Sequence, residues 1–104
     1  MSERLETLKS LVAQNPADSF MRYGLAMEYA NSGDPESAVA EFNALIAVNQ
    51  DYAAAYYQGG HALEKLGRLD DARDFYRRGI AVTTRTGDQH TRSELQASLD
   101  FLGE

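Results

Sequence analysis

The sequence has no cysteine and no tryptophan, and only two of its 104 residues are proline. The lack of cysteine excludes disulfides, thiolate metal sites and cysteine nucleophiles from the chemistry of this chain. No apolar run approaches the ~20 residues that a membrane-spanning helix needs. The first residues, Met-Ser-Glu-Arg-Leu-Glu, are charged and do not read as a secretory signal. We therefore expect a cytoplasmic protein that has no contact with a membrane.

Basic residues are also few. Ten Lys and Arg stand against 16 Asp and Glu, which gives a formal net charge of −6. Nucleic-acid binding needs an excess of Lys and Arg, so we expect no nucleic-acid partner. Five arginines cluster late in the chain, namely Arg73, Arg77, Arg78, Arg85 and Arg92. Nearby Asp70 and Asp74 favour a solvated helix face with ion pairs, and a docking patch for an acidic partner is the alternative.

Motifs of catalysis are missing as well. The chain has no Gly-rich phosphate loop of the GxxxxGK type and no serine in a GxSxG elbow. His61 and His90 lie 29 residues apart without a further residue at metal-ligand spacing. The carboxylate pair Asp70-Asp71 is expected at a helix start, where the helix dipole stabilises acids. We therefore expect no enzyme activity, no metal and no cofactor.

Helical spacing of apolar residues runs through the whole chain, and no window shows the alternation of a strand. An all-α fold is therefore expected. The apolar stripes and the turn residues predict helices over 3–14, 17–31, 35–48, 52–66 and 70–85, and a last one that begins between 88 and 91. No linker is long enough to separate two domains, so 1–104 is expected to be a single domain.

Several residues predict where these helices begin and end. Pro16 is expected to open the second helix, since proline is tolerated at the first helical position. Asp34 is expected to cap the third helix, which follows Gly33, a residue free to take a positive φ. Thr91 and Glu94 have the spacing of a capping box for the last helix.

The chain also repeats itself. Residues 19–52 align with 53–86 at an offset of 34, and the matched pairs are Tyr23/Tyr57, Gly33/Gly67, Ala38/Ala72, Phe42/Tyr76 and Ile46/Ile80. A fixed period of this length is typical of stacked helical repeats. Small residues at matched places would let helix axes approach closely. Glycine inside a helix costs roughly 1 kcal/mol against alanine, so Gly59-Gly60 is expected to have a packing reason.

The pattern resembles the tetratricopeptide repeat family, whose unit is a helix-turn-helix of about 34 residues. Residues 53–86 supply Tyr56, Gly59, Gly60, Leu63, Gly67, Ala72, Tyr76 and Gly79, and residues 19–52 supply Leu25, Ala26, Tyr29, Gly33, Ala38, Phe42 and Leu45. Two departures are Arg22, which replaces a large aromatic, and Thr84, which replaces proline. The resemblance implies a right-handed α-solenoid of antiparallel hairpins with a half-repeat helix (1–16), two repeats (17–50 and 51–86) and a capping helix (87–104).

The resemblance also implies a protein-interaction module that binds a peptide segment of a partner in a concave groove lined by the first helix of each repeat. The family's inner-face positions correspond here to Phe20, Tyr23, Met27, Asn31, Tyr57, Gln58, His61 and Lys65, with Gly24, Ala54 and Glu64 beside them. The aromatic character favours an apolar or aromatic partner segment. In an alternative interpretation, a terminal helix covers this face, and Phe20, Tyr23 and Met27 are ordinary core.

Some family members clamp acidic chaperone tails with Lys, Asn and Arg. This chain has Tyr23, Met27 and Gln58 where such a clamp needs Lys and Asn, so that ligand class is not expected. Two repeats also make a short groove. A self-assembling subunit without a separate peptide ligand is therefore the alternative function, and a homo-oligomer would use the terminal helices through Leu5, Phe101 and Leu102.

Overall fold

The structure is a computed structural model that describes residues 2–103, and these residues form six α-helices without a strand. The helices are α1 (Glu3–Gln14), α2 (Ser19–Asn31), α3 (Pro35–Val48), α4 (Ala53–Lys65), α5 (Leu69–Thr86) and α6 (Gln89–Leu102). The all-α prediction is confirmed, and each predicted boundary lies within two residues of the observed one.

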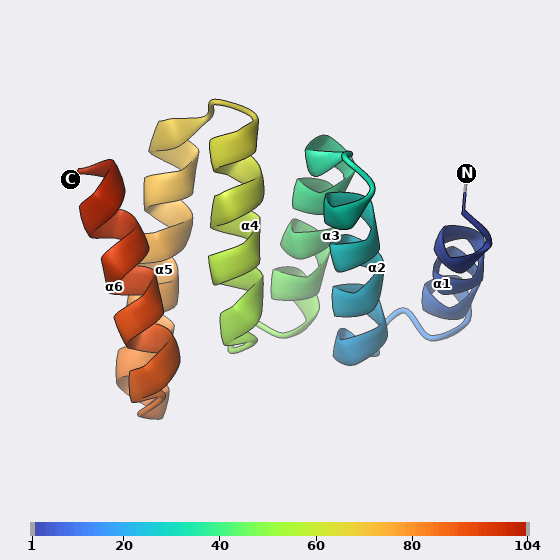
Figure 1. Cartoon of the computed structure of the whole chain (residues 1–104). Coiled ribbons are helices and arrows are strands. Elements are labelled where there is room, and N and C mark those ends of the chain that lie inside the picture. The colour runs from blue at the N-terminus through green and yellow to red at the C-terminus, as the bar shows by residue number, and fades with distance from the viewer. Residues whose placement is uncertain (1, 104) are drawn as a thin grey trace.

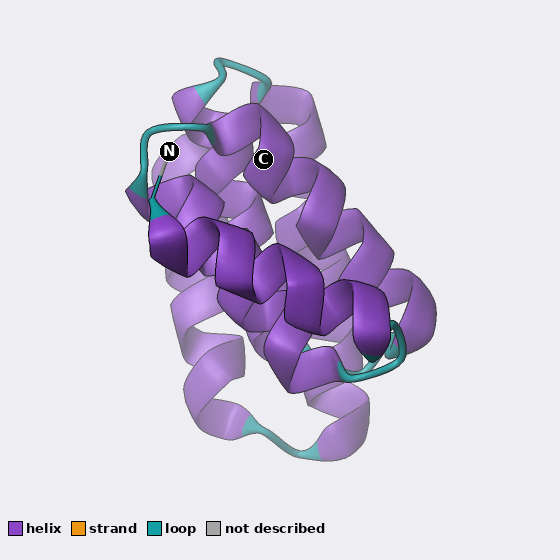
Figure 2. Cartoon of the chain, turned by 90° about the vertical axis from the view of Figure 1, so that its right-hand side faces the viewer, coloured by secondary structure: helices purple, strands orange, loops and turns teal. Residues whose placement is uncertain are grey.

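The helices stack as a solenoid in two layers. Figure 1 is viewed onto α2, α4 and α6, with α3 and α5 behind them. The backbone of helix α4 comes close to both α2 and α6, whereas no Cα atom of α3 lies within 8 Å of one in α5. The layer of α2, α4 and α6 is therefore the inner, concave side of the stack. Seen from the α1 end, the chain consists of helices joined by short loops (Figure 2).

Two predicted helix ends are confirmed around the turn between α2 and α3. Gly33 has a φ of 81°, the left-handed conformation that glycine adopts without strain. The side chain of Asp34 accepts a hydrogen bond from the Ser37 N–H at 3.1 Å and caps α3, with Pro35 at its first position.

The prediction for Pro16 is wrong, because Pro16 lies in the turn before α2. The helix begins at Ser19, after Asp18, whose carboxylate accepts a hydrogen bond from the Met21 N–H at 3.0 Å. A side-chain acceptor satisfies one of the orphan N–H groups of the helix, which proline does not do. The start of α2 is therefore set by Asp18.

The capping box at Thr91 is also wrong. Thr91 lies inside α6, and its N–H donates at 3.1 Å to Asp88, which is the cap. Helix α5 has 18 residues where α3 has 14, and a tight turn at Gly87 follows it. As a result α6 begins 36 residues after α4, although α4 begins 34 residues after α2. The extra two residues turn α6 out of the phase of the repeat.

The main core runs from α2 to α6, and a small second cluster of Leu5, Val12 and Leu25 holds α1 on α2. Glycines permit the closest approaches in the main core. A Cβ on Gly59 would lie 2.5 Å from Cε2 of Phe75, and one on Gly60 would overlap the ring of Tyr76. The predicted packing reason for these two glycines is confirmed.

Candidate partner-binding face

The predicted groove residues lie on α2 and α4, the two inner helices at the middle of the stack. Their spacing of three and four residues places them along one side of each helix. Phe20 is 74% exposed, and Asn31 and Lys65 at the helix ends are exposed as well. The others are half-buried, namely Tyr23, Met27, Tyr57, Gln58 and His61. The face is thus open at its ends and partly packed in its middle.

Tyr23 connects this face to the core. Its ring lies 5.3 Å from that of Tyr52 and 6.1 Å from that of Phe42, measured between centroids. Burial raises the pKa of the Tyr23 hydroxyl, the charge of Tyr52 acts in the same direction, and a hydrogen bond with Gln58 opposes both. Through the Tyr52 ring, Tyr23 of α2 contacts the turn that precedes α4. The ring contacts of Tyr23 are with Phe42 and Tyr52 rather than with a terminal helix, whereas Phe20 is 74% exposed.

His61 occupies the junction of α4, α5 and α6. Its ring lies 4.4 Å from the Tyr57 ring and meets the edge of the Tyr76 ring at 5.9 Å. Its Nε2 is 3.3 Å from the hydroxyl of Ser98 on α6. The Tyr76 hydroxyl donates to the carboxylate of Glu64, and burial together with this bond raises the pKa of Tyr76. Glu64 is therefore engaged in the protein and is not a free groove residue.

Three residues near this face were not among the predicted groove residues. Tyr52 stacks on Tyr23 but precedes α4, so the helical spacing of α4 does not include it. Ser98 reaches His61 from α6, whose phase differs from that of the repeat. Phe101, one turn after Ser98, is 87% exposed, and the sequence predicts it as an oligomer contact rather than as a groove residue.

Charge is scarce on α2 and α4. Arg22 pairs with Glu41 at 3.2 Å, Glu28 pairs with Arg4 at 2.8 Å, and Glu64 accepts from Tyr76. Among residues 2–103, Lys65 is the charged residue of these two helices that has neither an ion pair nor a side-chain hydrogen bond. The inner face formed by α2 and α4 is therefore close to neutral, although the chain carries a net charge of −6.

The late arginines are largely held by neighbouring groups. Arg73 pairs with Asp70 at 2.9 Å and donates to the Gly103 carbonyl at 2.6 Å. Arg78 pairs with Asp74 at 3.5 Å, and Arg85 pairs with Asp51. Arg73, Arg78 and Arg85 therefore match the solvated helix face, whereas Arg77 and Arg92 are exposed and form no ion pair within residues 2–103.

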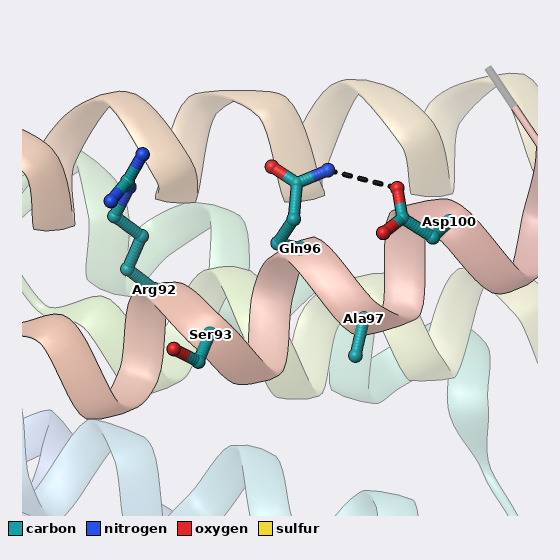
Figure 3. Close-up of a pocket in the computed structure, with 5 residues that line it drawn as sticks. All are labelled: Arg92, Ser93, Gln96, Ala97 and Asp100. Atoms are coloured by element: carbon teal, nitrogen blue, oxygen red, sulfur yellow. Dashed lines mark hydrogen bonds between the residues drawn. The ribbon is translucent and has the colours of Figure 1, made fainter.

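The outward side of α6 is polar. A shallow hollow of about 330 Å³ follows it, lined by Arg92, Ser93, Gln96, Ala97 and Asp100 (Figure 3). The amide of Gln96 donates to Asp100 at 2.9 Å. At the other end of the stack, Leu5 is 6% exposed and packs toward α2. Leu5 is therefore unavailable as the oligomer contact expected from the sequence.

A sequence profile of the tetratricopeptide repeat matches residues 23–86. The chain belongs to the tetratricopeptide repeat family. It is 39% identical to a tetratricopeptide repeat domain protein from Salinibacter ruber, with a TM-score of 0.77 over 82% of this chain and 94% of that one. A protein from Bordetella parapertussis is 27% identical, with a TM-score of 0.83 over 98% of this chain and 89% of that one.

A tetratricopeptide repeat-containing protein of Pseudomonas aeruginosa is 26% identical over 98 residues, which cover 94% of this chain and 93% of the relative. The tetratricopeptide repeat is a scaffold for protein–protein interaction, and this tetratricopeptide repeat protein is a module of that kind. Within residues 2–103 no helix is long and apolar enough to cross a membrane, and no group of three or more His, Asp or Glu side chains could hold a metal ion.

Proposed function

We propose that the concave face of α2 and α4 binds a short, uncharged apolar or aromatic segment of a partner protein. The observation that carries this proposal is the row of accessible aromatic and methionine side chains on a nearly neutral inner face. Phe20, Tyr23 and Met27 supply it from α2, and Tyr57 and His61 from α4. In this interpretation α1 (within 1–16) is half a repeat, 17–50 and 51–86 are the two repeats, and 87–104 forms the cap.

The physical basis is contact area at low entropic cost. Tyrosine and phenylalanine offer large surfaces with few rotatable bonds, and methionine adapts to irregular partners. Gln58 and His61 add hydrogen-bonding groups beside these rings. Because two inner helices make a short face, the interface should fall below about 1,200 Å² and bind weakly or transiently.

Replacing Tyr57 by alanine tests the proposal. A peptide selected on an array with the wild-type protein would be titrated into both proteins by calorimetry. Tyr57 lies at the centre of the face, so we expect Tyr57→Ala to weaken binding by about 30-fold, the effect of a central aromatic anchor. Val48→Ala is the matched control because Val48 is 47% exposed and belongs to the outer helix α3. If wild type and Tyr57→Ala bound the peptide with equal affinity and had equal melting temperatures, the proposed binding site on this face would be wrong.

The self-assembling subunit is less well supported. Stacking ends needs apolar terminal surfaces, and on α6 Phe101 is 87% exposed, whereas the outward side of the same helix carries Arg92, Gln96 and Asp100. Leu5 is buried against α2. Binding of a separate partner segment therefore remains the function that the accessible inner face favours.

A further inference from the structure

A cavity of about 450 Å³ lies away from the concave face, between the start of α1 and the turn that joins α2 to α3. Its lining residues are Ser2, Leu5, Tyr29, Ser32, Asp34 and Ser37. The start of α1 and this turn lie at the same end of the stack, along the upper edge of Figure 1. None of the predicted groove residues lines this cavity.

A second cavity of about 200 Å³ occupies the equivalent place in the next repeat. It is lined by Val39, Asn43, Leu63, Arg68, Asp71, Asp74 and Phe75. Four of the residues that line the first cavity have counterparts here at an offset of 34, namely Leu5/Val39, Tyr29/Leu63, Asp34/Arg68 and Ser37/Asp71. The two cavities are therefore the same feature of the fold with different side chains.

The second cavity holds its own cation. The guanidinium of Arg68 pairs with the Asp71 carboxylate, at 2.7 Å from Nη2 and 2.9 Å from Nε to Oδ2. In the first cavity Asp34 stands in the place of Arg68, and Ser37 stands in the place of Asp71. The first cavity is thus larger and lacks a guanidinium, and its carboxylate is at the position that Arg68 takes in the second.

That carboxylate is charged and has no cation beside it. Hydrogen bonds from Ser37 hold the pKa of Asp34 below its usual value. The three basic residues of the first 52 are each paired with a glutamate, as Arg4–Glu28, Lys9–Glu6 and Arg22–Glu41. Within residues 2–103, Asp34 forms no ion pair with any of them.

We propose that this cavity binds an arginine side chain of a partner protein. The guanidinium would pair with Asp34, and the aliphatic stem would pack on Leu5 and the Tyr29 ring. The chain itself indicates this occupant, because Arg68 lines the equivalent cavity and its guanidinium pairs there with the carboxylate of Asp71. An isolated guanidinium offers the planar, multiple-donor geometry that a carboxylate and serine hydroxyls can accept. This site does not depend on the proposed function of the concave face.

Titration of the whole chain with N-acetyl-arginine amide, followed by ¹⁵N-edited NMR, tests the proposal. We expect saturable shifts of the Tyr29, Ser32 and Ser37 amides with a dissociation constant of about 1 mM, which is typical of so small a ligand. Asp34→Asn keeps an N-cap because asparagine caps helices as well as aspartate does, and it should weaken binding by about 10-fold. Asp18→Asn, at the cap of α2, is the matched control and should change nothing.

A reciprocal exchange between the repeats gives a second measurement. Asp34→Arg with Ser37→Asp places the Arg68–Asp71 pair in the first cavity and should abolish the shifts. Arg68→Asp with Asp71→Ser empties the second cavity and should create a new set of shifts around Leu63. The proposal is overturned if the shifts are absent, if Asp34→Asn leaves them unchanged, or if N-acetyl-lysine amide produces them equally. The Tyr57→Ala test of the concave face is independent of this site, so failure of one proposal would leave the other standing.

Discussion

The two complete hairpins, α2–α3 and α4–α5, have the same helix order and different chemistry at their centres. Arg22 and Glu41 form an ion pair at 3.2 Å in the first hairpin. The residues at the same places in the second, Tyr56 and Phe75, form an edge-on aromatic pair with centroids 6.3 Å apart. The repeat therefore constrains how closely two helices pack, but it leaves open whether charge or aromatic surface fills the contact.

The neighbouring residues compensate for this difference. In the second hairpin the Phe75 ring lies over Gly59, where the first hairpin has Leu25. Leu25 packs in the cluster with Leu5 and Val12 that holds α1 on α2. The ion pair of the first hairpin carries a desolvation cost that the aromatic pair does not, because the Nε of Arg22 is buried without a hydrogen-bond partner. At these positions the larger apolar side chain is on α5 in the second hairpin and on α2 in the first. The two hairpins also differ in whether their central pair of side chains is charged or aromatic.

The largest expected effect comes from moving the leucine of the first hairpin into the second. Gly59→Leu would place a side chain where a Cβ already comes within 2.5 Å of Phe75. We expect it to lower the free energy of unfolding by about 3 kcal/mol, the upper part of the range for overpacking. Urea denaturation measures this loss.

Gly24→Ala is the matched control for that substitution, since a Cβ there meets Cδ2 of Leu8 at an ordinary 3.6 Å. Alanine favours the helix, so Gly24→Ala should raise the free energy of unfolding by about 0.5–1 kcal/mol. If Gly59→Leu were as stable as the wild type, the close contact of α4 with α5 would be wrong.

The ion pair of the first hairpin gives the next largest effect. The side chains of Arg22 and Glu41 are 15% and 24% exposed, so removing one charge strands the other in a half-buried place. We expect Glu41→Leu to cost about 1–3 kcal/mol. Adding Arg22→Met should recover most of this loss, because an apolar pair of similar volume replaces a buried ion pair with little net change. Chemical denaturation of the two single variants and the double variant measures the coupling, and simple additivity would show that the pair is too hydrated to matter.

The same contrast explains what the sequence could predict. Spacing and backbone sterics act locally. They predict the helix positions, the need for small residues at Gly59 and Gly60, and the helix ends at glycine. The residues that cap α2 and α6 were mispredicted, although the helix starts were within two residues, because the carboxylates of Asp18 and Asp88 accept the capping hydrogen bonds. The contact of His61 with Ser98 was not predicted, because the longer α5 shifts α6 out of the phase of the repeat. Tyr52 and Phe101 depend on tertiary placement, which a helical pattern does not contain.

The smallest expected effect is a difference between the two hairpins in how low pH destabilises the start of their second helix. Helix α3 is capped by Asp34, whereas Arg68 at the same place before α5 makes no side-chain cap. Hydrogen bonds from Ser37 lower the pKa of Asp34, so its contribution is complete above the usual aspartate range and disappears as the pH falls through the lowered value. Below about pH 4, protection of the first α3 amides against hydrogen exchange should therefore fall more than that of the first α5 amides. Asp34→Asn, which caps without titrating, should remove this difference, and equal acid sensitivity of the two helices in the wild type would mean that the carboxylate cap does not set the stability of α3.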